Sequence, residues 1–203
     1  MVPSFPRNWL VRENPGRIPA SFGKFDIGTI ALSAVGLAAW TFFPASLATG
    51  ALLIAGAVFN SVRLARWAGD RTLGDPLVLI LHIAFVFAPL GLLLAGLTVL
   101  APGVVPAAAG IHAFAVGAVA CMTLAVMTRA SLGYTGRELA AGAGTRAIFV
   151  AIVIAAILRI AAAMAPGAPI LLHVSAALWV TAFVGYAVFF GGMLTRPRRQ
   201  ARN

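Results

Sequence analysis

PLVLILHIAFVFAPLGLLLAGLTVL, residues 76–100, decides the fold class of this protein. The stretch carries no charged side chain, and its one titratable group at neutral pH is His82. About 20 consecutive apolar residues in a helix cross the hydrocarbon core of a bilayer. Residues 76–100 therefore predict a transmembrane helix.

The composition of the whole chain agrees with this prediction. Of the 203 residues, 61% are hydrophobic and only 10% are charged, and the mean hydropathy is +0.98. A soluble domain has roughly 45–50% apolar and about 25% charged residues, so this chain cannot hide its apolar surface in its own core. It is predicted to be an integral membrane protein that binds no nucleic acid, despite a net charge of +10. Its single cysteine, Cys121, excludes an internal disulfide and is interpreted as a small buried side chain rather than a reactive thiolate.

Six apolar runs are long enough to cross a bilayer, which predicts an all-α, six-transmembrane helix bundle. The expected spans are Ile27–Phe43, Ala45–Val62, Pro76–Leu100, Val105–Thr128, Ala147–Met164 and Pro169–Leu194.

The charges sort to one side of these spans. Fourteen of the 15 basic residues fall in the N-terminal segment, in the second-to-third and fourth-to-fifth connections, and in the C-terminal segment, which six spans place on one side. The positive-inside rule makes that side cytoplasmic and places both termini in the cytoplasm. We expect a cytoplasmic or interfacial arm over residues 1–24, a transmembrane domain over residues 25–195 and a basic tail over residues 196–203.

Four titratable groups remain inside the spans: His82, His112, His173 and Arg159. Such groups are costly in hydrocarbon and often mark a functional site, but a neutral histidine can also hydrogen-bond between helices. At 1.5 Å per residue, His112, His173 and Arg159 lie about 6–10 Å from the outer ends of three different spans. His82 lies about 9 Å from the inner end of its span, so the count places it in a different layer.

Arg159 has no carboxylate in its layer, and two interpretations are open. The side chain can extend to the outer surface, or an external anion can complete the site. A haem would offer an iron that takes imidazole nitrogen and propionates that an arginine can hold. Small side chains one and two turns below both outer histidines leave room for a planar ligand: Ala115, Val116, Val119 and Ala120 on one span, and Ala176, Ala177 and Val180 on the other.

The inner loop after the fourth span contains Arg129, Tyr134 and Arg137, with glycines that permit a tight turn. It is either a rigid loop whose arginines meet anionic lipid headgroups or an anion or propionate site facing a cofactor near His82.

The sequence resembles the NnrS family of bacterial membrane proteins. The strongest match is H-x₄-G-x₄-M-T-L-A-V-M-T-R-A-x-L-G-x-T-G-R, which runs from His112 to Arg137. Supporting matches are RTLGDPLVLILHIAFVFAPLGLLL around His82, the segment around Arg159, and LWVTAFVGYAVFFGGMLTRPR after His173. The similarity covers most of residues 60–199, and the chain resembles the C-terminal half of typical members.

The resemblance implies a protein of the response to nitric oxide or nitrosative stress that holds b-type haem iron and, as a second metal, copper. It makes His82, His112 and His173 candidate metal ligands, and nitric oxide a candidate ligand. Because typical members have about twice as many spans, we expect a homo-oligomer or a second membrane subunit. Whether the haem catalyses or only senses the gas stays open. The alternative function is a cofactor-free transporter or metal-ion permease that uses the intramembrane histidines.

Overall fold

A computed structural model describes residues 3–13 and 16–195, and these residues form helices joined by short turns. Six helical stretches are long and apolar enough to cross a membrane. The helices are α1 (Ser4–Glu13), α2 (Lys24–Phe42), α3 (Leu47–Ala65), the short 3₁₀ helix η1 (Gly69–Arg71), α4 (Pro76–Leu100), α5 (Ala107–His112), the π-helix η2 (Ala113–Ala120), α6 (Cys121–Tyr134), α7 (Ala143–Met164) and α8 (Pro169–Leu194).

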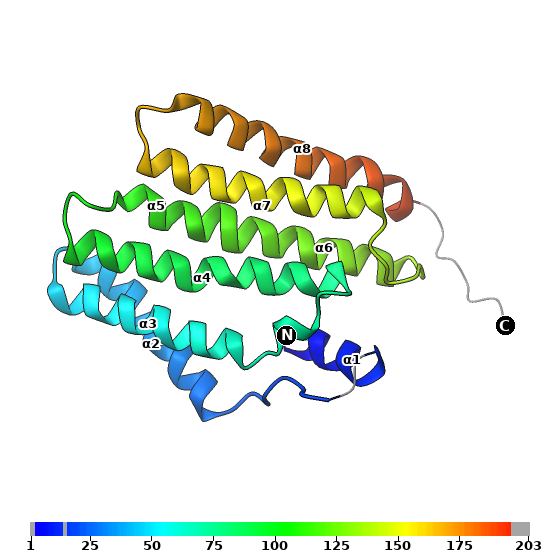
Figure 1. The fold of residues 1–203 in the computed structure, drawn as a ribbon, viewed down its shortest axis with the longest axis horizontal. Coiled ribbons are helices and arrows are strands. Elements are labelled where there is room, and N and C mark those ends of the chain that lie inside the picture. Colours follow the sequence, from blue (N-terminus) through cyan, green and yellow to red (C-terminus); the bar gives the residue numbers. More distant parts are fainter. Residues whose placement is uncertain (1–2, 14–15, 196–203) are drawn as a thin grey trace.

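The spans run alongside one another, with α2 and α8 at opposite edges and α4 near the middle (Figure 1). In α4, 56% of the apolar window is buried inside the protein, compared with 17% in α2 and in α8. The stretch that decides the fold class is therefore also the centre of the molecule, and the two edge helices leave most of their apolar side chains for lipid.

The six predicted spans are confirmed, and the positions of their ends show which sequence features start and end a helix. Two spans, Pro76–Leu100 and Pro169–Leu194, have the predicted bounds, and both start with proline, which suits the first position of a helix. The other four differ by a few residues. The largest difference is at α6, which continues past the predicted end at Thr128 to Tyr134, because a helix can extend beyond the hydrocarbon once its backbone is capped.

The fourth span contains a π-helix that sequence periodicity did not predict. Residues 113–120 follow i→i+5 hydrogen bonding directly after His112. Here η2 packs on α4 through two aromatic–glycine contacts. A Cβ on Gly117 would lie 2.4 Å from the Phe87 ring, and one on Gly91 would lie 2.9 Å from the Phe114 ring. π-helical segments are rare and are frequent at functional sites, and this one starts at a candidate ligand.

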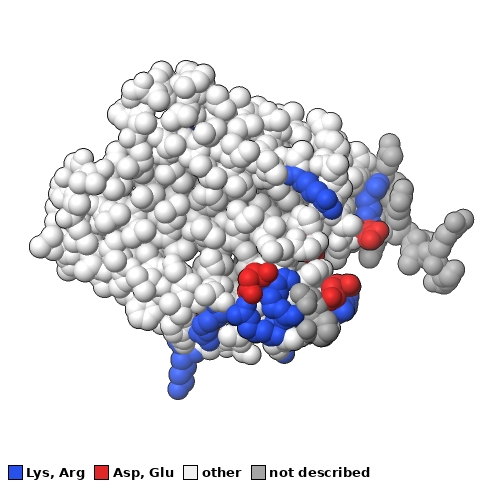
Figure 2. Space-filling view, viewed as in Figure 1, with Lys and Arg blue, Asp and Glu red and all other residues white. Residues whose placement is uncertain are grey.

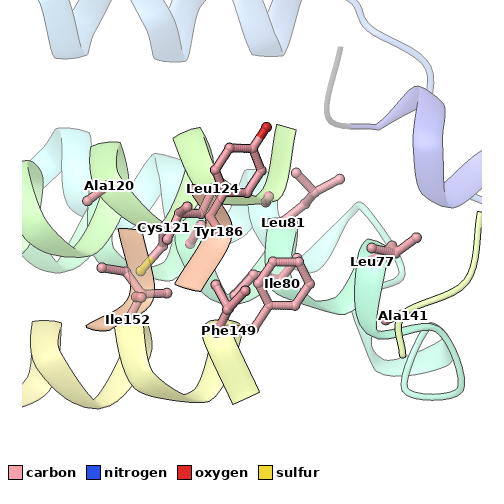
Figure 3. Packing of buried hydrophobic residues seen from close by; sticks show 14 of the residues in the cluster. Leu77, Ile80, Leu81, Ala120, Cys121, Leu124, Ala141, Phe149, Ile152 and Tyr186 are labelled. Atoms are coloured by element: carbon pink, nitrogen blue, oxygen red, sulfur yellow. The ribbon is translucent and has the colours of Figure 1, made fainter. Parts of the chain in front are cut away.

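The main hydrophobic core lies where α4, η2, α6, α7 and α8 meet (Figure 3). Leu81, Leu124 and Ile152 are fully or almost fully buried there. Cys121 belongs to the same cluster and is completely buried, which confirms its interpretation as a packing residue. A second, smaller cluster joins α3 to α4 through Leu53, Ala57, Leu92 and Ala95.

Charged side chains gather at one end of the molecule, the end that carries α1 and the turns before α4 and α7 (Figure 2). We call it the charged end. Asp26 and Arg63 form a mostly buried ion pair of 2.9 Å there, and Arg17 pairs with Asp70. The N-terminal arm includes α1, whose Leu10 is 0% exposed. Its place at a membrane interface stays a prediction, and the predicted basic tail, residues 196–203, lies outside the described residues.

Candidate functional site

His112 and Arg159 come together at the end of the bundle opposite the charged end. His112 is the last residue of α5, immediately before η2, and it is partly buried. Arg159 lies near the end of α7, and its guanidinium acts electrostatically on the His112 imidazole. His112 and Arg159 thus lie in the same part of the bundle, and their shared role in one site stays a prediction.

A groove of about 240 Å³ lies between the fourth span, α7 and α8, and Arg159 lines it whereas His112 does not. Its lining residues are Val116, Arg159, Ser175, Ala176, Trp179 and Val180. Ser175 fixes α8 against α7, because its Oγ donates a 2.8 Å hydrogen bond to the Ala155 carbonyl. Ala176 and Val180 are among the small residues that the sequence indicated, so the room predicted beside α8 is present in the structure.

Arg159 is the unsatisfied group of this groove. Its Nε is buried and, among the residues that the structure describes, has no hydrogen-bond partner. The acidic residues of the chain lie at the charged end, on α1, α2, η1 and the turns before α4 and α7. A guanidinium cannot readily lose its proton, and a buried donor without a partner costs about 1–3 kcal/mol. The groove therefore favours an anionic group from outside the described chain.

His173 stands outside this groove. It is exposed, and it is not among the lining residues. Ser175, two residues further, faces α7, and two residues correspond to about 200° around a helix. The His173 side chain therefore points away from α7. The depth of His173 in its span follows from the sequence, but the direction in which it points does not.

His82 lies at the charged end, where it lines a cavity of about 540 Å³ together with Arg17, Gly69 and Asp70. The side chain is 6% exposed, and Nδ1–H donates to the Val78 carbonyl at 3.2 Å. The ring meets Trp67 edge-on, at 6.3 Å between centroids, and a Cβ on Gly69 would lie 2.5 Å from its Cδ2. Nε2 is buried beside the backbone of Trp67 and has no partner with hydrogen-bond geometry in the described part of the chain.

The inner loop is a capped helix end. Gly136 has a φ of +67°, the Arg137 N–H donates to the Leu132 carbonyl, and the Gly136 N–H donates to the Gly133 carbonyl. This is the Schellman pattern, which needs a left-handed residue and satisfies the last carbonyls of α6.

The side chains of the loop point to different surroundings. Tyr134 is 80% exposed. Arg129 lies 4.6 Å above the Phe5 ring of α1 and interacts electrostatically with the Asp75 carboxylate. Arg129 Nη1 is buried and has no hydrogen-bond partner among the described residues, and an anion site at Arg129, Tyr134 and Arg137 stays a prediction.

The three histidines, all within the described residues, do not form one metal cluster. No group of three or more His, Cys, Asp or Glu side chains is placed there to hold an ion. Sequence reasoning missed Ser175 and Trp179 as parts of the outer groove. Their signals were modest: a serine two residues after His173, and a tryptophan inside a segment that supported the family resemblance.

Comparisons with known proteins agree with the resemblance noted in the sequence. No curated protein and no solved structure matches the chain. The family model described as NnrS protein matches residues 1–198, almost the whole chain. With six helices that can span a membrane, this multi-pass membrane protein therefore belongs to the NnrS family.

Proposed function

We propose that this protein is a haem protein of the bacterial inner membrane that takes part in the response to nitric oxide or nitrosative stress. Membership of the NnrS family supports the link to nitric oxide. The observation that carries the haem proposal is the buried, unsatisfied guanidinium nitrogen of Arg159 in the lining of a groove, with the partly buried His112 imidazole in the same part of the bundle.

Arg159 in the outer groove and His112 near it carry the two kinds of group that a haem requires. His112 would ligate the iron through a ring nitrogen, and Arg159 would hold a propionate by a charge-assisted hydrogen bond. The apolar walls at Val116, Trp179 and Val180 would keep water from the macrocycle. Bound haem would supply an iron that binds nitric oxide.

The other candidate ligands have different roles in this proposal. His82 lines a cavity of about 540 Å³ at the charged end, where it would be the candidate ligand for copper. His173 is exposed on an edge helix, where a second copy of the chain or a second membrane subunit would cover it. Both histidines are secondary to His112.

We also propose that the charged end faces the cytoplasm. The basic residues of α1, the turn before α4 and the turn before α7 all lie there, as the positive-inside rule requires of a cytoplasmic end. A protease added to intact spheroplasts should leave a C-terminal tag untouched. Removal of the tag from outside would reverse the orientation.

Visible spectroscopy of the purified protein tests the proposed function. We expect a Soret band in the oxidised protein, its shift on reduction and a second shift on adding nitric oxide. A haemochrome assay should identify the extracted cofactor as b-type haem. Protein purified after growth with a haem precursor that shows no Soret band would instead favour the cofactor-free transporter.

A further inference from the structure

A second groove lies between α4 and α7 and starts at the charged end. Its volume is about 230 Å³, and all of its lining side chains except one are apolar. They are Pro76, Leu79, Ile80 and Ile83 on α4, and Phe149, Val150, Val153 and Ile154 on α7. At 1.5 Å per residue, this lining extends about 10–12 Å along the helix axes, and that length matches a substantial part of an acyl chain.

Arg146 is the one charged residue of this groove. It is exposed in the first turn of α7, and its Nε donates a 3.0 Å hydrogen bond to the Ala141 carbonyl. That bond holds the guanidinium in place and leaves four of its five N–H groups for other acceptors. Arg17 and Arg63 each have a carboxylate partner, whereas Arg146 forms no ion pair with the residues described in the structure. The groove thus has an apolar floor and an uncompensated cation at its charged-end mouth.

We propose that this groove binds one anionic glycerophospholipid, with an acyl chain along α4 and α7 and the phosphate on Arg146. The groove lies between two membrane spans, and acyl chains are the apolar occupant that a bilayer supplies. A guanidinium fork binds phosphate oxygens in a charge-assisted, bidentate manner. A zwitterionic lipid carries its own ammonium beside the phosphate, so it gains less from Arg146 than a lipid with net negative charge.

Native mass spectrometry of the full chain in mild detergent tests this site. The probes are dioleoyl phosphatidylglycerol and dioleoyl phosphatidylcholine, which have the same acyl chains and differ in net charge. We expect the first to bind about fivefold more tightly at one site, because one basic residue near a membrane surface contributes roughly that factor toward an anionic lipid. Arg146→Gln should remove the preference, and Arg146→Lys should keep most of it.

Two further variants distinguish specific lipid binding in this groove from nonspecific attraction of anionic lipid to the charged end and from misfolding of a variant. Lys24→Gln removes one exposed charge from the start of α2 at the same end of the molecule, and we expect it to keep the preference. Val150→Trp places a large side chain at an exposed position of the groove and should weaken both lipids equally. Equal binding of the two lipids by the native chain, or loss of the preference in Lys24→Gln but not in Arg146→Gln, would overturn the proposal.

Discussion

Arg63 and Arg159, at opposite ends of the bundle, have different surroundings. At the charged end, Arg63 has the Asp26 carboxylate at 2.9 Å and lies over the rings of Trp67 and Phe85. At the other end, Arg159 has a buried nitrogen without a partner in the described residues. The first arginine is explained by the fold, whereas the second needs something that the fold does not provide.

The two histidines differ in burial and in what lies beside them. His82 is 6% exposed, packs against Trp67 and lines a cavity of about 540 Å³, while His112 is partly buried near Arg159. The difference teaches that burial of the imidazole alone does not separate a packing histidine from a candidate ligand.

The largest effect on stability is expected at the charged end. Arg63→Met should lower the free energy of unfolding by about 3–5 kcal/mol, because it leaves the buried Asp26 carboxylate without its cation. Unfolding of the purified protein in mixed micelles measures this loss. A loss below about 1 kcal/mol would show that the two ends do not differ as described.

Gly69→Ala tests how tightly His82 is enclosed. The new Cβ would lie 2.5 Å from the ring, and overpacking of this kind costs about 1–3 kcal/mol. The double variant Gly69→Ala with His82→Ala should lose less stability than the sum of the two single variants, as coupled neighbours do. Additive losses in the same unfolding assay would mean that the ring and the glycine are not in contact.

Ser175→Ala tests how α8 is held beside the outer groove. Loss of the buried hydrogen bond to the Ala155 carbonyl should cost about 0.5–1.5 kcal/mol. Thr181→Ala is the matched control, because the Thr181 hydroxyl is exposed and bonds only within its own helix. Equal losses in the two variants would argue against an anchoring role for Ser175.

The smallest loss of stability is expected for Arg159→Leu in the haem-free protein. Its Nε is buried and has no hydrogen-bond partner in the described structure, so the substitution should not lower the free energy of unfolding and should recover part of the roughly 1–3 kcal/mol that a buried unsatisfied donor costs, about 1 kcal/mol. Haem retention should nevertheless weaken by about 1.5–3 kcal/mol, the value of a hydrogen bond to a charged group. Haem transfer to apomyoglobin measures retention. Unchanged retention would remove Arg159 from the site.

Much of the fold could be predicted from the sequence, because hydropathy and proline placement act locally. Pro76 and Pro169 mark the starts of two spans, and the charge-free turns mark one side of the bundle. The π-helix could not be predicted, because the Phe87–Gly117 and Phe114–Gly91 contacts join residues far apart in the chain. The end of α6 was missed because its cap at Gly136 lies in a polar segment, beyond the apolar run.

For the candidate site, the depth of each side chain in its span was predictable, but the direction in which the side chain points was not. Counting residues along three spans placed His112 and Arg159 in one layer, and both lie in the same part of the bundle. The same count placed His173 in that layer, yet its side chain is exposed on α8. The rise per residue gives the depth of a side chain in the membrane. The direction in which the side chain points depends on how its helix is rotated about its own axis, and the Ser175 hydrogen bond to the Ala155 carbonyl fixes that rotation for α8.

The central claim is that His112, at the end opposite the charged end, holds the haem and that His82 does not. The most direct measurement is the Soret absorbance per protein of His112→Ala and His82→Ala, purified side by side with the native chain. We predict that His112→Ala either loses the Soret band or shows a band changed by the loss of an iron ligand, while His82→Ala keeps the native spectrum. Loss of the band in His82→Ala together with a native spectrum in His112→Ala would contradict the account.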